Sequence, residues 1–214
     1  PTRRSSDLTI RSQPDSARVR VWTVAGATHS EQYSLLSRAA FLMRDLNLPA
    51  VDTCETPARS RVEIRYVYNA AVDWLARWVT TGSEPPHAPP LEFDEAAPPE
   101  PARGRGAAGG EKPVRRDEFG NVRGGIRLPE MAVPVAKESA ELCGLGGTHV
   151  PFDTATLTRL YPSHGDYVSK VTAASRALVK AGFLLPADAA QEIDAAKRSI
   201  YGLPLTCGLL CSDV

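Results

Sequence analysis

The chain has 214 residues, of which 43% are hydrophobic and 23% are charged, as is usual for a globular protein with one core. Its 25 basic and 25 acidic residues cancel, so net charge gives no attraction to nucleic acid or to an anionic membrane surface. No run approaches the roughly 18 apolar residues that a membrane-spanning helix needs. We therefore expect no nucleic-acid partner and no membrane span, while the compartment, cytoplasmic or exported, stays open.

The first predicted element is a strand that leads into a loop with one histidine. From Val19 to Val24, β-branched residues alternate along the chain, and Gly26 between two alanines ends the strand. Residues 31–46 predict a helix with Ser30 as its N-cap and an apolar face of Tyr33, Leu36, Ala40, Met43 and Leu46. His29 falls in the loop between them, where an imidazole can act as a general base. The alternative is a histidine that only caps the helix.

A second helix and a linker follow. Residues 62–80 predict a helix that ends before Gly82, with an apolar face of Val67, Ala71, Trp74, Leu75 and Trp78. Residues 85–113 are rich in Pro, Gly, Ala and Glu, and we expect them to form a mobile linker.

The C-terminal half predicts a hairpin and three helices. Gly120-Asn121 is a turn dipeptide inside the hairpin of residues 114–134. Asp117 and Glu118 precede it, but the alternating ligands of a calcium loop are missing, so a turn is favoured. Asp153 or Thr154 begins a helix to residue 161, and further helices are expected over 163–180 and 186–200, ended by glycines.

The remaining candidate groups favour structural roles. The glycine-rich run from Cys143 to His149 lacks a phosphate-loop lysine and predicts a tight loop, and a Cys143–His149 thiol–base pair is disfavoured. The four cysteines lack zinc-site spacing, and Cys54 with Cys143 would form a disulfide if the protein is exported. We expect His87 and His164 to be solvated or to cap helices, and we expect no metal and no cofactor.

Several segments resemble, in order, the bacterial alpha/beta hydrolase domain family. They are VRVWTVAGATHSEQY around His29, NAAVDWLARWV from Asn69, RDEFGN and GGIRLP in the hairpin, and PFD and LYPSH near the C-terminal helices. The resemblance implies a fold class of α/β, namely the C-terminal portion of an α/β-hydrolase fold. This portion would be mostly helical, with the last strand of the sheet and a β-hairpin.

The resemblance also implies a catalytic role for His29. It would be the triad histidine of a serine esterase acting on a small ester or acyl substrate, and it would follow the nucleophile and the acid in the chain. No Gly-x-Ser-x-Gly occurs in the sequence, so we expect an N-terminally truncated fragment that is inactive alone and self-associates. Asp7 is the candidate acid, and Asp15 is the other acid in that region.

The expected organisation follows the same resemblance. Residues 1–8, which resemble a translated sequencing adapter, would be a non-native extension, and 9–84 would hold the last strand, the histidine loop and helices of the hydrolase core. The linker over 85–113, the hairpin and C-terminal helices over 114–203, and a loose tail over 204–214 would complete the chain. The alternative function is a non-catalytic helical interaction module.

Overall fold

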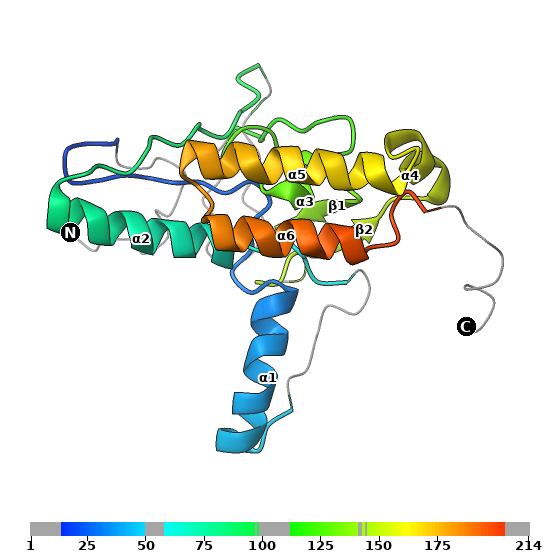
Figure 1. The fold of residues 1–214 in the computed structure, drawn as a ribbon, viewed down its shortest axis with the longest axis horizontal. Helices are drawn as coiled ribbons and strands as arrows, with labels where there is room; N and C mark the ends of the chain where they lie inside the picture. Colours follow the sequence, from blue (N-terminus) through cyan, green and yellow to red (C-terminus); the bar gives the residue numbers. More distant parts are fainter. Residues whose placement is uncertain are drawn as a thin grey trace.

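The computed structural model describes residues 14–49, 58–96, 98, 112–140, 143 and 145–203. These residues form helices and one two-stranded sheet (Figure 1). The helices are α1 (Gln32–Leu46), α2 (Arg65–Thr81), α3 (Pro129–Ala132), α4 (Thr154–Leu160), α5 (His164–Ala181) and α6 (Pro186–Arg198), and the strands are β1 (Ala136–Ser139) and β2 (Thr148–Pro151).

The C-terminal helices α5 and α6 lie side by side, and α2 lies next to their connection (Figure 1). Gly182 ends α5 in the left-handed conformation, at φ 83°, and Pro186 begins α6. The indole Nε1 of Trp74 on α2 donates to the Gly182 carbonyl at 2.8 Å, and Asn69 donates to both carboxylate oxygens of Asp188 on α6. These bonds fix α2 against the turn that joins α5 to α6.

Two groups of buried apolar side chains form the core. The larger group joins the segment before α1, the start of α2, the hairpin and the α5–α6 turn: Ala25, Val62, Tyr66, Val67, Ile126, Leu128, Met131, Phe183, Leu184 and Ala189. The smaller group lies between α3, α4, α5 and α6: Val133, Tyr161, Tyr167, Val171 and Ala196. Burial of these side chains supplies most of the stabilisation expected for such a fold.

The local helix signals are confirmed. Asp153 accepts a hydrogen bond from the Thr156 N–H at 2.7 Å, and Ser163 accepts one from the Asp166 N–H at 3.1 Å. Gly82 ends α2 at φ 75°. Side-chain oxygens at N-caps and left-handed glycines at C-caps are the interactions that the sequence predicts there.

The strand predicted from Val19 to Val24 is wrong for the described residues. This segment is extended but pairs in parallel at a single position, Val24 with Ile126. The bonds are Ala25 N–H to the Ile126 carbonyl (2.9 Å) and Ile126 N–H to the Thr23 carbonyl (2.8 Å). Gly124 and Gly125 have φ values of 74° and 66°. The bend that they form lies directly before Ile126, so the pairing with residues 19–24 does not continue there.

Strand β2 begins within the run from Cys143 to His149, where the sequence predicts only a tight loop. Strands β1 and β2 pair antiparallel, and Glu138 lies opposite His149. The opposite edge of β2 is also bonded at one position, because the backbone N–H of His149 donates to the Ala58 carbonyl at 2.7 Å. The glycine-rich run therefore ends in a strand, and only its first part turns.

Helix α1 extends away from the other helices (Figure 1). Its N-cap is Glu31, whereas the predicted cap Ser30 accepts a hydrogen bond from Arg38 at 2.7 Å. None of the residues of α1 is buried. The expected packing of its apolar face is wrong for the described residues, since Tyr33, Leu36, Phe41, Met43 and Leu46 are exposed.

The first part of the expected linker, residues 85–96, lies against the body of the molecule. Leu91 bridges to Gly124 and Phe93 to Val114, and the Trp22 indole donates to the Pro86 carbonyl at 2.8 Å. The predicted hairpin is present, with Arg116 bridged to Val122. Most of residues 97–111 lie outside the described part of the chain.

Candidate functional site

The loop that carries His29 is fixed on both sides of the histidine. Gly26 has φ 69°, and a Cβ there would lie 2.7 Å from the Met131 sulfur, so only glycine fits. After the histidine, the Ser30 N–H donates to the Leu145 carbonyl at 3.0 Å, and Arg59 donates to the Ser30 carbonyl at 2.7 Å. The neighbouring side chains are buried, which gives the loop a defined backbone.

The imidazole of His29 itself is exposed. Among the described residues it has no hydrogen-bond partner and no ion-pair partner. A histidine in this position can be reached by a substrate or by another segment of protein. The alternative role as a helix cap is not observed, because the N-cap of α1 is Glu31 and makes no side-chain cap bond.

Neither candidate acid is observed next to His29. Asp7 lies outside the described residues. Asp15 instead bonds the His87 Nδ1 at 2.5 Å and accepts the Val21 N–H at 2.8 Å, and these bonds lower the pKa of its carboxyl, the Val21 bond most. Asp15 is therefore engaged with His87 rather than with His29.

The structure contains a histidine–carboxylate pair that sequence reasoning missed. The His149 Nδ1 lies 2.5 Å from the Glu138 Oε1, and the two side chains are 4% and 2% exposed. An ionised carboxylate only accepts, so Nδ1 carries the proton of this hydrogen bond, and in the neutral ring Nε2 is then an acceptor. The second Glu138 oxygen accepts the Arg61 N–H at 3.1 Å, and the Glu138 N–H donates to the Asn121 side chain at 2.8 Å. These hydrogen bonds fix the orientation of the Glu138 carboxylate toward His149.

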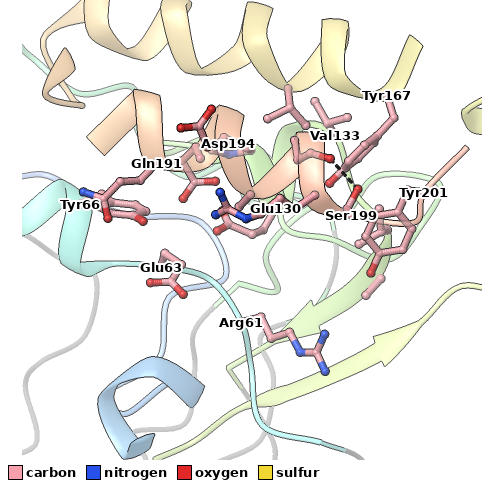
Figure 2. Close-up of a pocket in the computed structure, with 18 of the residues that line it drawn as sticks. Arg61, Glu63, Tyr66, Glu130, Val133, Tyr167, Gln191, Asp194, Ser199 and Tyr201 are labelled. Atoms are coloured by element: carbon pink, nitrogen blue, oxygen red, sulfur yellow. Dashed lines mark hydrogen bonds between the residues drawn. The ribbon is translucent and has the colours of Figure 1, made fainter. Parts of the chain in front are cut away.

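This pair borders a pocket of about 590 Å³. Its wall comes from residues 61–66, α3, β1, β2, α5 and α6. In Figure 2, Tyr66, Gln191 and Glu63 surround one end, Glu130 lies near the middle, and Tyr167 and Tyr201 lie at the other end. His29 is not among the residues that line it, so the structure does not bring the two histidines into one site.

Two carboxyl groups in the pocket are in an unusual electrostatic environment. Burial and the neighbouring Glu192 raise the pKa of Glu130 well above its ordinary value. Burial, followed by the charge of Glu63, raises the pKa of Glu192 to about 7. Burial also raises the pKa of the Tyr66 and Tyr167 hydroxyls. Such groups gather in functional sites more often than elsewhere.

The other candidate residues have structural contacts. Asp117 closes the hairpin turn by accepting the Phe119 and Asn121 N–H groups at 3.0 and 2.9 Å, as a turn requires. His164 contacts the carbonyls of Lys197 and Tyr201. Cys143 is disulfide-bonded, and Cys54 lies outside the described residues, so their pairing stays a prediction. The described residues include no group of His, Cys, Asp or Glu arranged to hold a metal ion.

Comparison with known proteins places the chain in a family. The alpha/beta hydrolase domain family matches residues 5–194, which include His29 and Asp7, and the chain belongs to this family. We found no significant match among curated proteins or among solved structures. Among the described residues, no helix is long and apolar enough to cross a membrane.

Proposed function

We propose that this member of the alpha/beta hydrolase domain family contributes the catalytic histidine of a serine hydrolase that cleaves an ester or related acyl bond. The observation that carries the proposal is His29, an exposed imidazole without a partner among the described residues, on a loop whose backbone is fixed on both sides. A general base needs this combination of access and fixed position.

In this mechanism, His29 accepts the proton of the serine hydroxyl as the serine attacks the acyl carbon. It then donates the proton to the departing alkoxide. In the second half of the reaction a water molecule attacks the acyl carbon of the acyl-serine, His29 accepts the proton of the water and passes it to the serine oxygen, and the acid product leaves. The 214 residues hold no Gly-x-Ser-x-Gly. We therefore place the nucleophile in a longer chain that precedes this segment, and Asp7 stays the proposed acid.

The test uses two proteins. The 214-residue chain should stay unlabelled by a serine-reactive fluorophosphonate, and it should not hydrolyse p-nitrophenyl acetate above the free-histidine background. In a longer chain with an upstream Gly-x-Ser-x-Gly, His29→Ala should lower kcat/KM by about 10²–10⁴, the usual worth of a general base. His87→Ala, an exposed histidine bonded to Asp15, is the matched control and should leave turnover unchanged.

Stoichiometric labelling of the 214-residue chain would contradict the location of the nucleophile. Unchanged turnover in the His29 variant of the longer chain would remove His29 from the mechanism.

A helical interaction module is the second candidate function. It is favoured by α1, whose exposed apolar side chains have no cover among the described residues. Under this proposal the same face of α1 makes the chain self-associate, since exposed apolar patches of this kind mark interaction surfaces.

A further inference from the structure

The wall of the 590 Å³ pocket contains three polar groups that lack a partner among the described residues. They are the Oε2 of Glu130, the carboxyl group of Glu192 and the Nε2 of His149. Among these, the Glu130 Oε2 is fully enclosed, and a buried polar atom nearly always has a hydrogen-bond partner, so its unpartnered state requires an explanation.

Glu192 is the most informative of the three. It lies on the inner side of α6, it is only 9% exposed, and it makes no hydrogen bond or ion pair with a described residue. The Glu130 Oε2 on α3 is likewise enclosed without a partner. The charge of Glu192 raises the pKa of Glu130, and the charge of Glu63 raises that of Glu192. Ionisation of these buried carboxyl groups is favourable only when a positive charge close to them compensates the negative charge.

His149 adds an acceptor of a different kind. Its Nδ1 bonds to Glu138, so in the neutral ring its Nε2 offers a lone pair. Once the two carboxyl groups are ionised, their oxygens accept hydrogen bonds, and a ligand that satisfies them must donate.

The cations near the pocket compensate these groups only in part: the charge of Arg65 lowers the pKa of Glu192, but burial and Glu63 outweigh it. Arg65 is bound elsewhere: it pairs with Glu63 at 2.6 Å, donates to the Tyr66 hydroxyl at 2.6 Å, and lies over the Tyr33 and Tyr66 rings. Arg61 and Arg198 are exposed at the rim. The buried polar part of the wall is therefore mainly acidic and aromatic, and the arginines that line the pocket are more exposed.

We propose that this pocket binds a small organic cation that carries an ammonium or guanidinium group. Its N–H groups donate to Glu192, Glu130 and His149, and its apolar part lies against the rings of Tyr66 and Tyr167, which favour positive charge at their faces. This inference goes beyond the proposed hydrolase activity and does not depend on His29.

Calorimetric titration of the 214-residue chain with benzylammonium chloride tests the proposal, with benzyl alcohol as the neutral ligand of similar shape. Benzylammonium should bind at least about tenfold more tightly than the alcohol. Glu192 must lose its proton to pair with the cation, so binding at about pH 6 should release about one proton, measured by comparing buffers of different ionisation enthalpy. The charges that set this titration are Glu130, Glu63, Asp188 and Arg65.

Matched variants separate the site from the general charge of the protein. Glu192→Gln should weaken benzylammonium binding at least about tenfold and abolish the proton release, and Glu130→Gln should also weaken binding. Asp166→Asn removes an equal charge from α5 outside the pocket wall, where Asp166 is paired with Lys170 at 2.7 Å, so this control should bind normally.

Folding of the Glu192 variant has its own check. In the native chain Glu192 keeps its proton up to about pH 7, whereas an unfolded glutamate loses it near pH 4.5. Its contribution to stability therefore falls as pH rises between these values, and Glu192→Gln should melt at or above the native temperature at neutral pH. Equal binding of the alcohol, absence of benzylammonium binding, or unchanged binding by both glutamine variants would overturn the proposal.

Discussion

At the scale of single residues, two histidines of the chain differ in their exposure and in their hydrogen bonds. His29 is exposed and has no partner among the described residues, whereas His149 is buried and bonded to Glu138. The first arrangement leaves a side chain free for chemistry, and the second builds it into the fold. A histidine's sequence context does not by itself distinguish these two cases.

Replacement of the two histidines should therefore have unequal effects on stability. His149→Ala leaves the buried Glu138 carboxylate without its partner and should lower the free energy of unfolding by about 3 kcal/mol. His29→Ala should change it by less than about 0.5 kcal/mol. Urea denaturation of the two variants measures this difference. Equal midpoints would show that the His149–Glu138 pair does not stabilise the fold.

Whether the sequence predicts a residue of this site depends on how far apart along the chain the interacting residues are. His29 could be found because its loop and flanking residues form one continuous motif. The His149–Glu138 pair could not, since the two residues meet only through the register of β1 and β2. Glu192 and Glu130 come together through the packing of α6 near α3, which no local pattern specifies.

At the scale of elements, local rules predict the helices better than the strands. The caps at Asp153 and Gly182 depend on neighbouring residues alone, and both are confirmed, whereas Ser163, expected as the first residue of its helix, is the N-cap of α5. Strands β1 and β2 have four residues each and are held by partners distant in sequence, so their alternation is too short to recognise. The expected strand from Val19 failed for the opposite reason: its residues favour a strand, but in the described structure they form only isolated bridges, Val19 with Ser16 and Val24 with Ile126.

The turn before β2 supports the loop that carries His29, and Gly147 is its critical residue. Gly147 has φ 61°, and a Cβ there would collide with the Ser139 carbonyl and the Thr28 side chain. Gly147→Ala should therefore lower stability by about 3 kcal/mol, the sum of left-handed strain and overpacking. Thermal denaturation measures the loss.

Gly82→Ala is the matched control for this prediction. Gly82 has a similar φ of 75° but open space around its Cβ position. It should lose only the left-handed strain, about 1 kcal/mol. If both variants lost the same stability, crowding at Gly147 would play no part.

At the scale of the whole molecule, α1 is the element that the rest of the described structure does not cover. The other long helices bury side chains against a shared core, while α1 buries none. Amphipathic helices usually owe their stability to the packing of their apolar face. The exposed face of α1 is thus available for contacts between molecules.

We expect the chain to self-associate through α1 at micromolar concentration. Leu36→Lys with Met43→Lys places two charges on this face and should shift the sedimentation profile toward the monomer. Val79→Lys changes an apolar residue of α2 that is 78% exposed, and it should leave the profile of the native chain unchanged. A monomeric native chain would contradict this expectation.

The three tryptophans of the chain all lie at one junction. Trp22 bonds the Pro86 carbonyl and contacts Phe183 edge-on at 5.0 Å, Trp74 bonds the Gly182 carbonyl, and Trp78 lies 5.5 Å from the Arg20 guanidinium. Intrinsic fluorescence therefore reports the separation of these segments and is blind to α1, which has no tryptophan. Circular dichroism registers every helix, so a melting curve by ellipticity that precedes the fluorescence curve would mark α1 as a separately melting unit.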